Sequence, residues 1–257
     1  QVTNATVAQA DGGCLVDNVS LSLRSGEIVA IYGLLGSGRT ELLEYICGAR
    51  SGEGSITLHG QQLDHLPLPK RVEHGLLLVP EDRQRDGLFP NLNVGGNLGL
   101  SSLRRLVRRW LIPPAGEVAA VDEMISRLGI KAASWRAGIH ALSGGNQQKV
   151  VIGRCLMCDP EAILLDEPSR GVDVGARAEI FEAMRRLARD GMTIAFTTSD
   201  LMEALTIADR VVVMANGRLL ADLPADRADQ TLLTRAANGI APSTDAASHA
   251  NAAAALS

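Results

Sequence analysis

A glycine-rich segment between an apolar stretch and a helix-forming stretch constrains the fold of this chain most strongly. Residues 28–32 (Ile-Val-Ala-Ile-Tyr) predict a buried strand, residues 33–40 (Gly-Leu-Leu-Gly-Ser-Gly-Arg-Thr) predict a loop, and a helix expected from Thr40 is stopped by Gly48. In this order, backbone N–H groups of the loop can point at phosphate oxygens, and the helix N-terminus adds positive potential. For the loop taken alone, a glycine-rich turn that binds nothing is the alternative.

Two later segments add chemistry that such a loop needs. Residues 142–148 (Leu-Ser-Gly-Gly-Asn-Gln-Gln) precede an apolar helix, so their backbone N–H groups offer a second anion site. Asp166 and Glu167 follow the apolar strand 162–165. Asp166 is therefore placed to hold a Mg²⁺ shell together with the Thr40 hydroxyl, and Glu167 is placed to polarise an attacking water.

These segments, together with residues 80–88 and 166–176, carry a resemblance to a known family. The chain through about Gly239 resembles the C-terminal cassette of the double-cassette ATPases of ATP-binding-cassette (ABC) sugar importers, of the ribose, galactose and xylose type. The resemblance implies an α/β fold: a P-loop NTPase ABC cassette with a RecA-like parallel-sheet core, an antiparallel β subdomain and an inserted α-helical subdomain. The ATP-binding core with the β subdomain is expected in 1–87 and 160–240, and the helical signature subdomain in 88–159.

The same resemblance implies ATP and Mg²⁺ as ligands and assigns roles to residues. Residues 142–148 match the ABC signature, and the resemblance implies that in ABC dimers the signature caps the γ-phosphate of ATP bound on the opposite cassette. The expected catalytic residues are Glu167, Ser199 and Glu81, the expected metal-binding residues are Thr40, Asp166 and Glu81, and the expected ATP-binding residues are Gly33, Gly36, Ser37, Gly38, Arg39, Thr40, Glu41, Ser143, Gly144, Gly145 and Gln147.

Several positions depart from the pattern of an active cassette. Arg39 stands where the loop lysine is expected, Glu81 where most cassettes carry Gln, and Ser199 in the place of the switch histidine. No aromatic residue occurs at 10–13, where one usually stacks on adenine, and Tyr32 is expected in the core. A planar guanidinium does not copy the point charge of an ammonium, so we expect this chain's own site to be slow or inactive. The intact signature is expected to complete the site of the companion cassette.

The implied function is an ATPase domain that couples ATP binding and hydrolysis to carbohydrate uptake. Its implied partners are an N-terminal companion cassette of the same polypeptide, integral membrane permease subunits and, indirectly, a periplasmic substrate-binding protein. The expected location is peripheral, at the cytoplasmic face of the inner membrane, because no apolar run approaches the roughly 20 residues that span a bilayer. The start at Gln1 suggests a fragment of a longer protein. The alternatives are a soluble ABC ATPase acting on ribosomes or DNA ends, and a regulatory cassette that does not hydrolyse ATP.

Composition bears on these alternatives. A net charge of −4 argues against a nucleic-acid partner, which should leave a basic surface. Aromatic residues make up only 3%, so the core must consist of aliphatic side chains, as is common where helices cover both faces of parallel strands.

The C-x-x-C of Cys155 and Cys158 is interpreted as structural thiols rather than a redox or zinc site. The cluster of Arg104, Arg105, Arg108 and Arg109 is interpreted as a solvated helix face, with contact to a partner or lipid headgroups as the alternative. Residues 241–257 have almost nothing to bury and are predicted to form a disordered tail.

Overall fold

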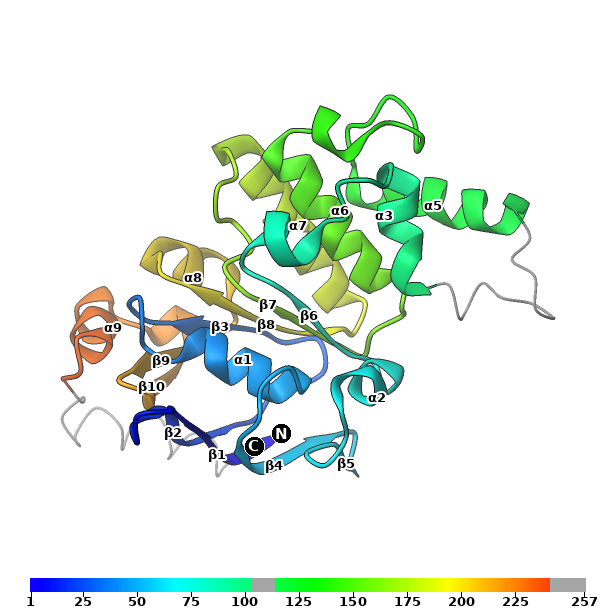
Figure 1. The fold of residues 1–257 in the computed structure, drawn as a ribbon. Coiled ribbons are helices and arrows are strands. Elements are labelled where there is room, and N and C mark those ends of the chain that lie inside the picture. The colour runs from blue at the N-terminus through cyan, green and yellow to red at the C-terminus, as the bar shows by residue number, and fades with distance from the viewer. Residues whose placement is uncertain (103–113, 241–257) are drawn as a thin grey trace.

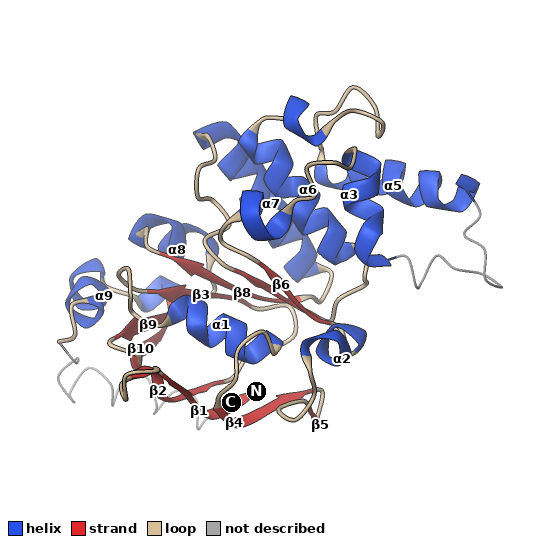
Figure 2. Ribbon diagram, in the orientation of Figure 1, coloured by secondary structure: helices blue, strands red, loops and turns tan. Residues whose placement is uncertain are grey.

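The computed structural model describes residues 1–102 and 114–240. The arginine cluster at 104–109 and the tail 241–257 lie outside the described residues, and so do the predictions made for them. Within the described part, the strands form two sheets and the helices cover them (Figures 1 and 2). No helix in this part has the length and apolar character that crossing a bilayer requires.

The larger sheet has six strands in the order β10-β9-β3-β8-β7-β6. All neighbours are parallel except β9 and β10, which form an antiparallel hairpin. The turn of this hairpin is Asn216-Gly217, a dipeptide that predicts a tight hairpin from the sequence, and both residues lie in the left-handed region (φ 50° and 75°), which confirms the prediction. The strand bounds are Ile28–Tyr32 (β3), Leu76–Val79 (β6), Ala162–Leu165 (β7), Thr193–Thr198 (β8), Arg210–Ala215 (β9) and Arg218–Pro224 (β10).

The smaller sheet is antiparallel, with four strands in the order β2-β1-β4-β5. Its strands are Val2–Ala8 (β1), Cys14–Leu21 (β2), Glu53–Leu58 (β4) and Gln61–Gln62 (β5). Helix α1 (Arg39–Cys47) lies between the two sheets (Figure 1). Its side chains Leu42 and Leu43 are fully buried in one apolar cluster with residues of both sheets, so α1 joins the sheets into one body.

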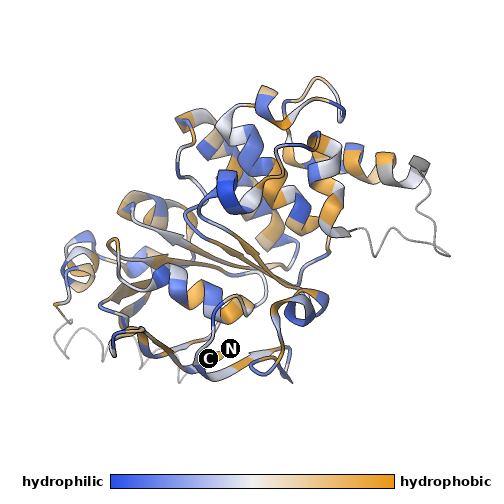
Figure 3. Cartoon of the chain, in the orientation of Figure 1, coloured by the Kyte–Doolittle hydropathy of each residue, from blue (hydrophilic) through white to orange (hydrophobic). Residues whose placement is uncertain are grey.

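The opposite face of the large sheet is covered by α6, α7, α8 and α9. Apolar residues of these helices form one buried cluster with those of the strands (Figure 3). Helices α3, α5 and α6 fall inside 88–159, and the buried cluster runs from the sheet into them without a break. The helix bounds are Leu68–Glu73 (α2), Val94–Gly99 (α3), Pro114–Leu128 (α5), Gly144–Leu156 (α6), Val174–Arg189 (α7), Leu201–Ile207 (α8) and Gln230–Ala237 (α9).

The strand register brings the functional loops to one edge of the large sheet. Tyr32 pairs with Thr198, Leu165 with Phe196 and Val79 with Leu165, so β3, β8, β7 and β6 end side by side. Parallel strands present their carboxyl ends at the same edge, where ligands of α/β proteins bind. The loops that begin at residues 33, 80, 166 and 199 therefore converge at this edge.

Candidate functional site

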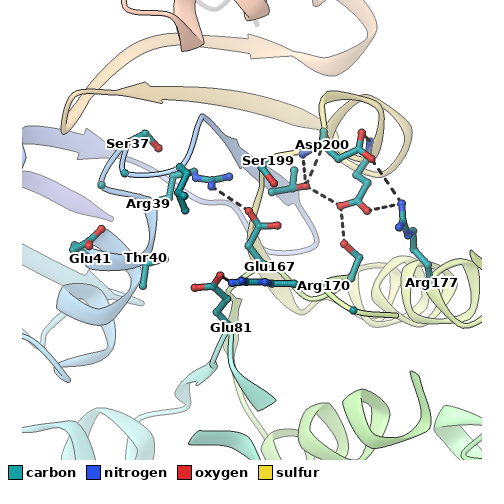
Figure 4. A pocket seen from close by; sticks show the side chains of 17 residues that line it. Ser37, Arg39, Thr40, Glu41, Glu81, Glu167, Arg170, Arg177, Ser199 and Asp200 are labelled. Atoms are coloured by element: carbon teal, nitrogen blue, oxygen red, sulfur yellow. Dashed lines mark hydrogen bonds and ion pairs between the residues drawn. The ribbon is translucent and has the colours of Figure 1, made fainter. Parts of the chain in front are cut away.

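A cavity of about 700 Å³ opens where these loops converge (Figure 4). It lies beside the first turn of α1 and the segments that follow β6, β7 and β8. The residues that were predicted from the sequence and that line it are Gly36, Ser37, Gly38, Arg39, Thr40, Glu41, Glu81, Glu167 and Ser199. The loop and three separate strand ends thus contribute to a single cavity.

Glycines of the loop at 33–40 are required by close backbone packing. A Cβ on Gly33 would overlap the backbone oxygen of Met214, and one on Gly38 would overlap that of Leu15. Gly38 also has a φ of 96°, a conformation that L side chains rarely adopt. Any side chain at Gly33 or Gly38 would therefore displace the loop.

Unpaired polar groups in the loop fit an anionic ligand. The N-cap of α1 is Gly38, which has no side chain to accept hydrogen bonds from the first helical turn. The buried Ser37 Oγ and Arg39 Nη1 have no hydrogen-bond partner among the described residues. A phosphate group would satisfy these donors and would be stabilised by the helix N-terminus.

Asp166 and Thr40, two predicted metal ligands, lie together: Thr40 lines the cavity, whereas Asp166 is buried and is not among the lining residues. The Thr197 hydroxyl donates to Asp166 Oδ1 at 2.5 Å, and the Thr40 hydroxyl also hydrogen-bonds to Asp166. Burial raises the pKa of Asp166, while these hydrogen bonds and the nearby Arg39 oppose the rise. One carboxylate and one hydroxyl suit Mg²⁺, which takes few protein oxygens and completes its shell with water and substrate phosphates. The described residues hold no group of three or more His, Cys, Asp or Glu side chains that could bind a metal alone.

Glu167 forms an ion pair with the arginine that replaces the loop lysine. Its Oε1 lies 3.1 Å from Arg39 Nη2, and the two side chains are only 14% and 7% exposed. Burial raises the pKa of Glu167, whereas Arg39 and a hydrogen bond with Ser199 lower it. The Glu167 backbone is left-handed (φ 44°), a strained state for a non-glycine residue that is typical of functional sites. The expected base is therefore in contact with two of the three substituted positions, Arg39 and Ser199.

Glu81, the third predicted metal ligand, is also paired with an arginine. Its carboxylate forms an ion pair with the guanidinium of Arg170. Arg170 lies in the segment after β7, the strand that pairs with β6. Any cation bound by Glu81 must replace this guanidinium or share the carboxylate with it. The role of Arg170 was not predicted from the sequence, because an arginine in a turn has no distinguishing pattern.

A second buried carboxylate, Glu203, was also missed. It accepts hydrogen bonds from Ser169 Oγ (2.9 Å) and Thr198 Oγ1 (2.8 Å), and it pairs with Arg177 Nη1 at 3.0 Å. These contacts join α7, α8 and the ends of β7 and β8 at one wall of the cavity (Figure 4). Glu203 thereby fixes the strand end that carries Ser199. Its only sequence signal is a polar residue in the first turn of a helix.

The signature residues lie outside this cavity, at the start of α6. Ser143 is the exposed N-cap, and Gly144 and Gly145 form the first turn. Gln147 is buried and hydrogen-bonded: its Oε1 accepts from Gln84 Nε2 at 2.6 Å, and its Nε2 donates to the Ile139 carbonyl. Ser143 and the helix start are therefore open to a ligand from outside, whereas the Gln147 side chain is already engaged within the chain.

Two further predictions can be located in the structure. Tyr32 is 5% exposed and belongs to the apolar core, which confirms its predicted place. Cys155 is buried, and burial raises its pKa to about 12, so its reactive thiolate form is disfavoured at neutral pH.

The sequence of this chain matches a known protein family and several curated proteins. A family model described as ABC transporter matches residues 16–170. The xylose import ATP-binding protein XylG of Brucella abortus (strain 2308) is 42% identical over 92% of this chain, and that of Pseudomonas fluorescens (strain Pf0-1) is 46% identical over 80%. These matches cover 46% and 40% of the two relatives, so the chain spans about half the length of the curated relatives it matches.

Solved structures share the fold. A dimeric ATP-binding cassette in a post-hydrolysis state bound to ADP and Pi superposes with a TM-score of 0.78 at 23% identity, covering 87% of this chain and 97% of that one. The ADP conformation of another ATP-binding cassette of an ABC transporter gives a TM-score of 0.76 at 26% identity, covering 91% and 93%.

Proposed function

This chain belongs to the ABC transporter family, and we propose that it is the second cassette of a double-cassette ATPase that drives import of a pentose such as xylose. Its fold is that of an ABC cassette. The sugar class is supported by the relatives that are named xylose import ATP-binding proteins. The second position is supported by the three substitutions in the site, because a cassette with a weakened site needs a companion that hydrolyses ATP.

The cavity at the carboxyl edge of the sheet is the proposed ATP site. The loop at 33–40 and the start of α1 would hold the phosphates, with the unpaired Ser37 Oγ and Arg39 Nη1 as donors. Thr40, Asp166 and Glu81 would hold Mg²⁺, which neutralises phosphate charge when it is bound. Glu167 would orient the attacking water.

The Arg39–Glu167 ion pair carries the proposal that this site hydrolyses ATP slowly. The Arg39 guanidinium, 3.1 Å from Glu167, opposes the rise in the pKa of Glu167 that burial causes, so the carboxylate is a weaker base toward water than it would be without Arg39. The Glu167 carboxylate also competes with a bound phosphate group for the Arg39 guanidinium. Ser199 hydrogen-bonds to Glu167 but has no proton-accepting imidazole, so it does not restore the role of the switch histidine.

The exposed signature supports the proposed division of labour. Ser143 and the N-terminus of α6 would complete the ATP site of the companion cassette. Permease subunits would couple closure of the two cassettes to transport, and a periplasmic substrate-binding protein would deliver the sugar. The proposed location is the cytoplasmic face of the inner membrane, attached through the permease.

MgATP titration by calorimetry, with phosphate release measured in parallel, tests the proposed site. We expect binding with release below ~0.1 s⁻¹, against a median of about 10 s⁻¹ for enzymes. Brisk release that Glu167→Gln abolishes would contradict the slow-site proposal. Absence of binding would contradict the ATP site and leave the signature as the chain's contribution.

Uptake of labelled xylose tests the transport proposal, with the intact ATPase, permease and binding protein reconstituted in liposomes. Ser143→Ala should lower ATP-driven uptake by about tenfold, because it removes a hydroxyl that would donate to phosphate. The change also removes the acceptor of Asn146 Nδ2, which lies 2.9 Å from Ser143 Oγ. The matched control is Ser134→Ala, which changes another exposed serine of the chain and should leave uptake unchanged. Full uptake in the Ser143 variant would refute the role of the signature, and no uptake of any pentose would refute the sugar class.

A further inference from the structure

Two arginines join the segments that follow β6 and β7 in both directions. The Arg83 guanidinium donates to the backbone carbonyls of Arg170 (Nη1, 2.7 Å) and Gly171 (Nη2, 3.0 Å). In return, the Arg170 guanidinium pairs with the Glu81 carboxylate. We name these four residues, Glu81, Arg83, Arg170 and Gly171, the arginine clasp. Each segment holds the other, so the two cannot separate without breaking contacts of both arginines.

The first turn of the signature helix α6 rests on this clasp. A Cβ on Gly144 would lie 2.8 Å from Arg83 Nη2 and 3.0 Å from the Gly171 carbonyl oxygen. Gly144 is therefore in contact with the guanidinium and with one of the carbonyls that it binds. The backbone at Gly144 therefore packs directly against the Arg83 guanidinium.

Neighbouring contacts attach the same segment to the rest of α6. Residues Arg83–Gly87 form a single π-helical turn, capped by the Asp82 side chain, which accepts from the backbone of residues 84 and 85. From this turn, Gln84 donates to Gln147, and the Gly87 carbonyl accepts from Arg154. The turn thus lies along α6, and Arg83 is its contact with the helix N-terminus.

The geometry of Arg83 suits positioning. Its planar fork matches two consecutive carbonyls, which a lysine ammonium cannot do with the same geometry. Its Nε is buried without a hydrogen-bond partner among the described residues, so the side chain is oriented for the two carbonyls at the expense of its own third donor.

We propose that Arg83 is a positioning residue, which holds the signature turn at Gly144 in a fixed place relative to Glu81 of this chain's own ATP site. This inference rests on the proposed function, in which the signature completes the companion site.

Amide hydrogen exchange on this chain tests the positioning directly. Arg83→Gln should speed exchange of the Gln147 amide, which donates to the Ser143 carbonyl in the first turn of α6, by about tenfold, as expected for loss of a charge-assisted hydrogen bond. Arg83→Lys should give a smaller increase, because the charge remains and one carbonyl can still be bound. Arg85→Gln is the matched control: Arg85 lies in the same turn, is highly exposed and pairs with Asp86. Amide exchange in β3 reports whether each variant stays folded. If Arg83→Gln does not fold, the result for Arg83→Lys tests the proposal instead. Unchanged exchange of the Gln147 amide in a folded Arg83 variant would overturn the proposal.

Steady-state kinetics of the intact transporter in liposomes tests the consequence. Arg83→Gln should lower kcat for ATP hydrolysis about tenfold and leave KM for ATP within about twofold, because the contact is needed at the transition state of the companion site. ATP affinity of this chain measured by calorimetry should not change, and Arg83→Lys should recover part of the rate. Ser143→Ala is the reference. A lower rate in the Ser143 variant with a normal rate in the Arg83 variant would refute only the positioning role. Normal rates in both would refute the proposed signature function as well.

Discussion

Replacing Glu167 with Gln should tighten MgATP binding by removing the carboxylate that competes with phosphate for Arg39. In the nucleotide-free protein, the ion pair at 3.1 Å compensates a guanidinium that is only 7% exposed. Without the carboxylate, Arg39 keeps its charge but has only a neutral amide oxygen beside it. Bound phosphate would supply the missing negative charge, so the variant gains more from binding than the parent does.

The magnitude follows from the distance and the burial. Two unit charges 3.1 Å apart interact by about 5 kcal/mol at an effective dielectric constant of about 20. Removing one partner of a buried pair costs about 3–5 kcal/mol. The Gln amide oxygen retains a hydrogen bond, so we expect the free energy of unfolding without nucleotide to fall by about 2–3 kcal/mol. If phosphate restores the pairing, the Kd for MgATP should fall about 30- to 150-fold, since about 1.4 kcal/mol is a factor of ten.

Calorimetric titration with MgATP and urea unfolding without nucleotide measure the two effects. Glu44→Gln in α1 is the matched control, because Glu44 is also paired with an arginine but lies outside the cavity. An exposed pair of this kind contributes about 0–1 kcal/mol, so stability should change little and Kd should not change. The reasoning is refuted if Glu167→Gln leaves both Kd and the free energy of unfolding at their parent values.

Three further changes test other parts of the structure. Asp166→Asn should raise the free energy of unfolding at neutral pH, because burial raises the pKa of Asp166 and the parent loses stability as pH rises through that pKa. In urea unfolding, the gain should vanish below the ordinary pKa of 3.8. Glu179→Gln should destabilise the chain at neutral pH, because the ammonium of Lys149 lowers the pKa of Glu179 to about 2; the difference from the parent should shrink as pH falls from about 5 toward 2, and a difference independent of pH would contradict this cause. Gly145→Ala should lower the thermal midpoint, because its Cβ would overlap the Ala176 Cβ, and Ala176→Gly in the same chain should restore most of it despite a helix-propensity cost of about 1 kcal/mol; if the double variant is no more stable than Gly145→Ala, the overlap is not the cause.

Local signals predicted the elements of the large sheet well. The apolar runs at 28–32, 76–79 and 162–165 predict strands and form β3, β6 and β7, and Asn216-Gly217 predicts the hairpin, because each signal depends on adjacent residues. The apolar run at 192–196 predicts another strand, but β8 runs two residues beyond that end, since the polar Thr197 and Thr198 are buried and their hydroxyls bind Asp166 and Glu203.

Of the small sheet, the residues themselves predict only a strand at 55–58, which forms part of β4; the sheet as a whole was expected from the family resemblance. Strands β1 and β2 pair with several register shifts, and Asn4 and Asn18 adopt left-handed conformations within them. Such irregularities interrupt the alternation of apolar and polar residues by which a strand is recognised in a sequence. The helices α8 and α9 were not predicted either, because both are short and neither has the proline that marks the start of the short helix α2.

The sequence by itself determined the loop at 33–40, the strand ends that carry Asp166 and Glu167, and the family, because these depend on residue type and short spacing. Only the tertiary structure decided which groups these residues meet. Arg39 pairs with a carboxylate 128 positions away, and Arg83 binds carbonyls 87 and 88 positions away and touches the signature turn. Such contacts depend on the order and register of β3, β6, β7 and β8, which place distant strand ends side by side, and no local pattern in the chain records that order.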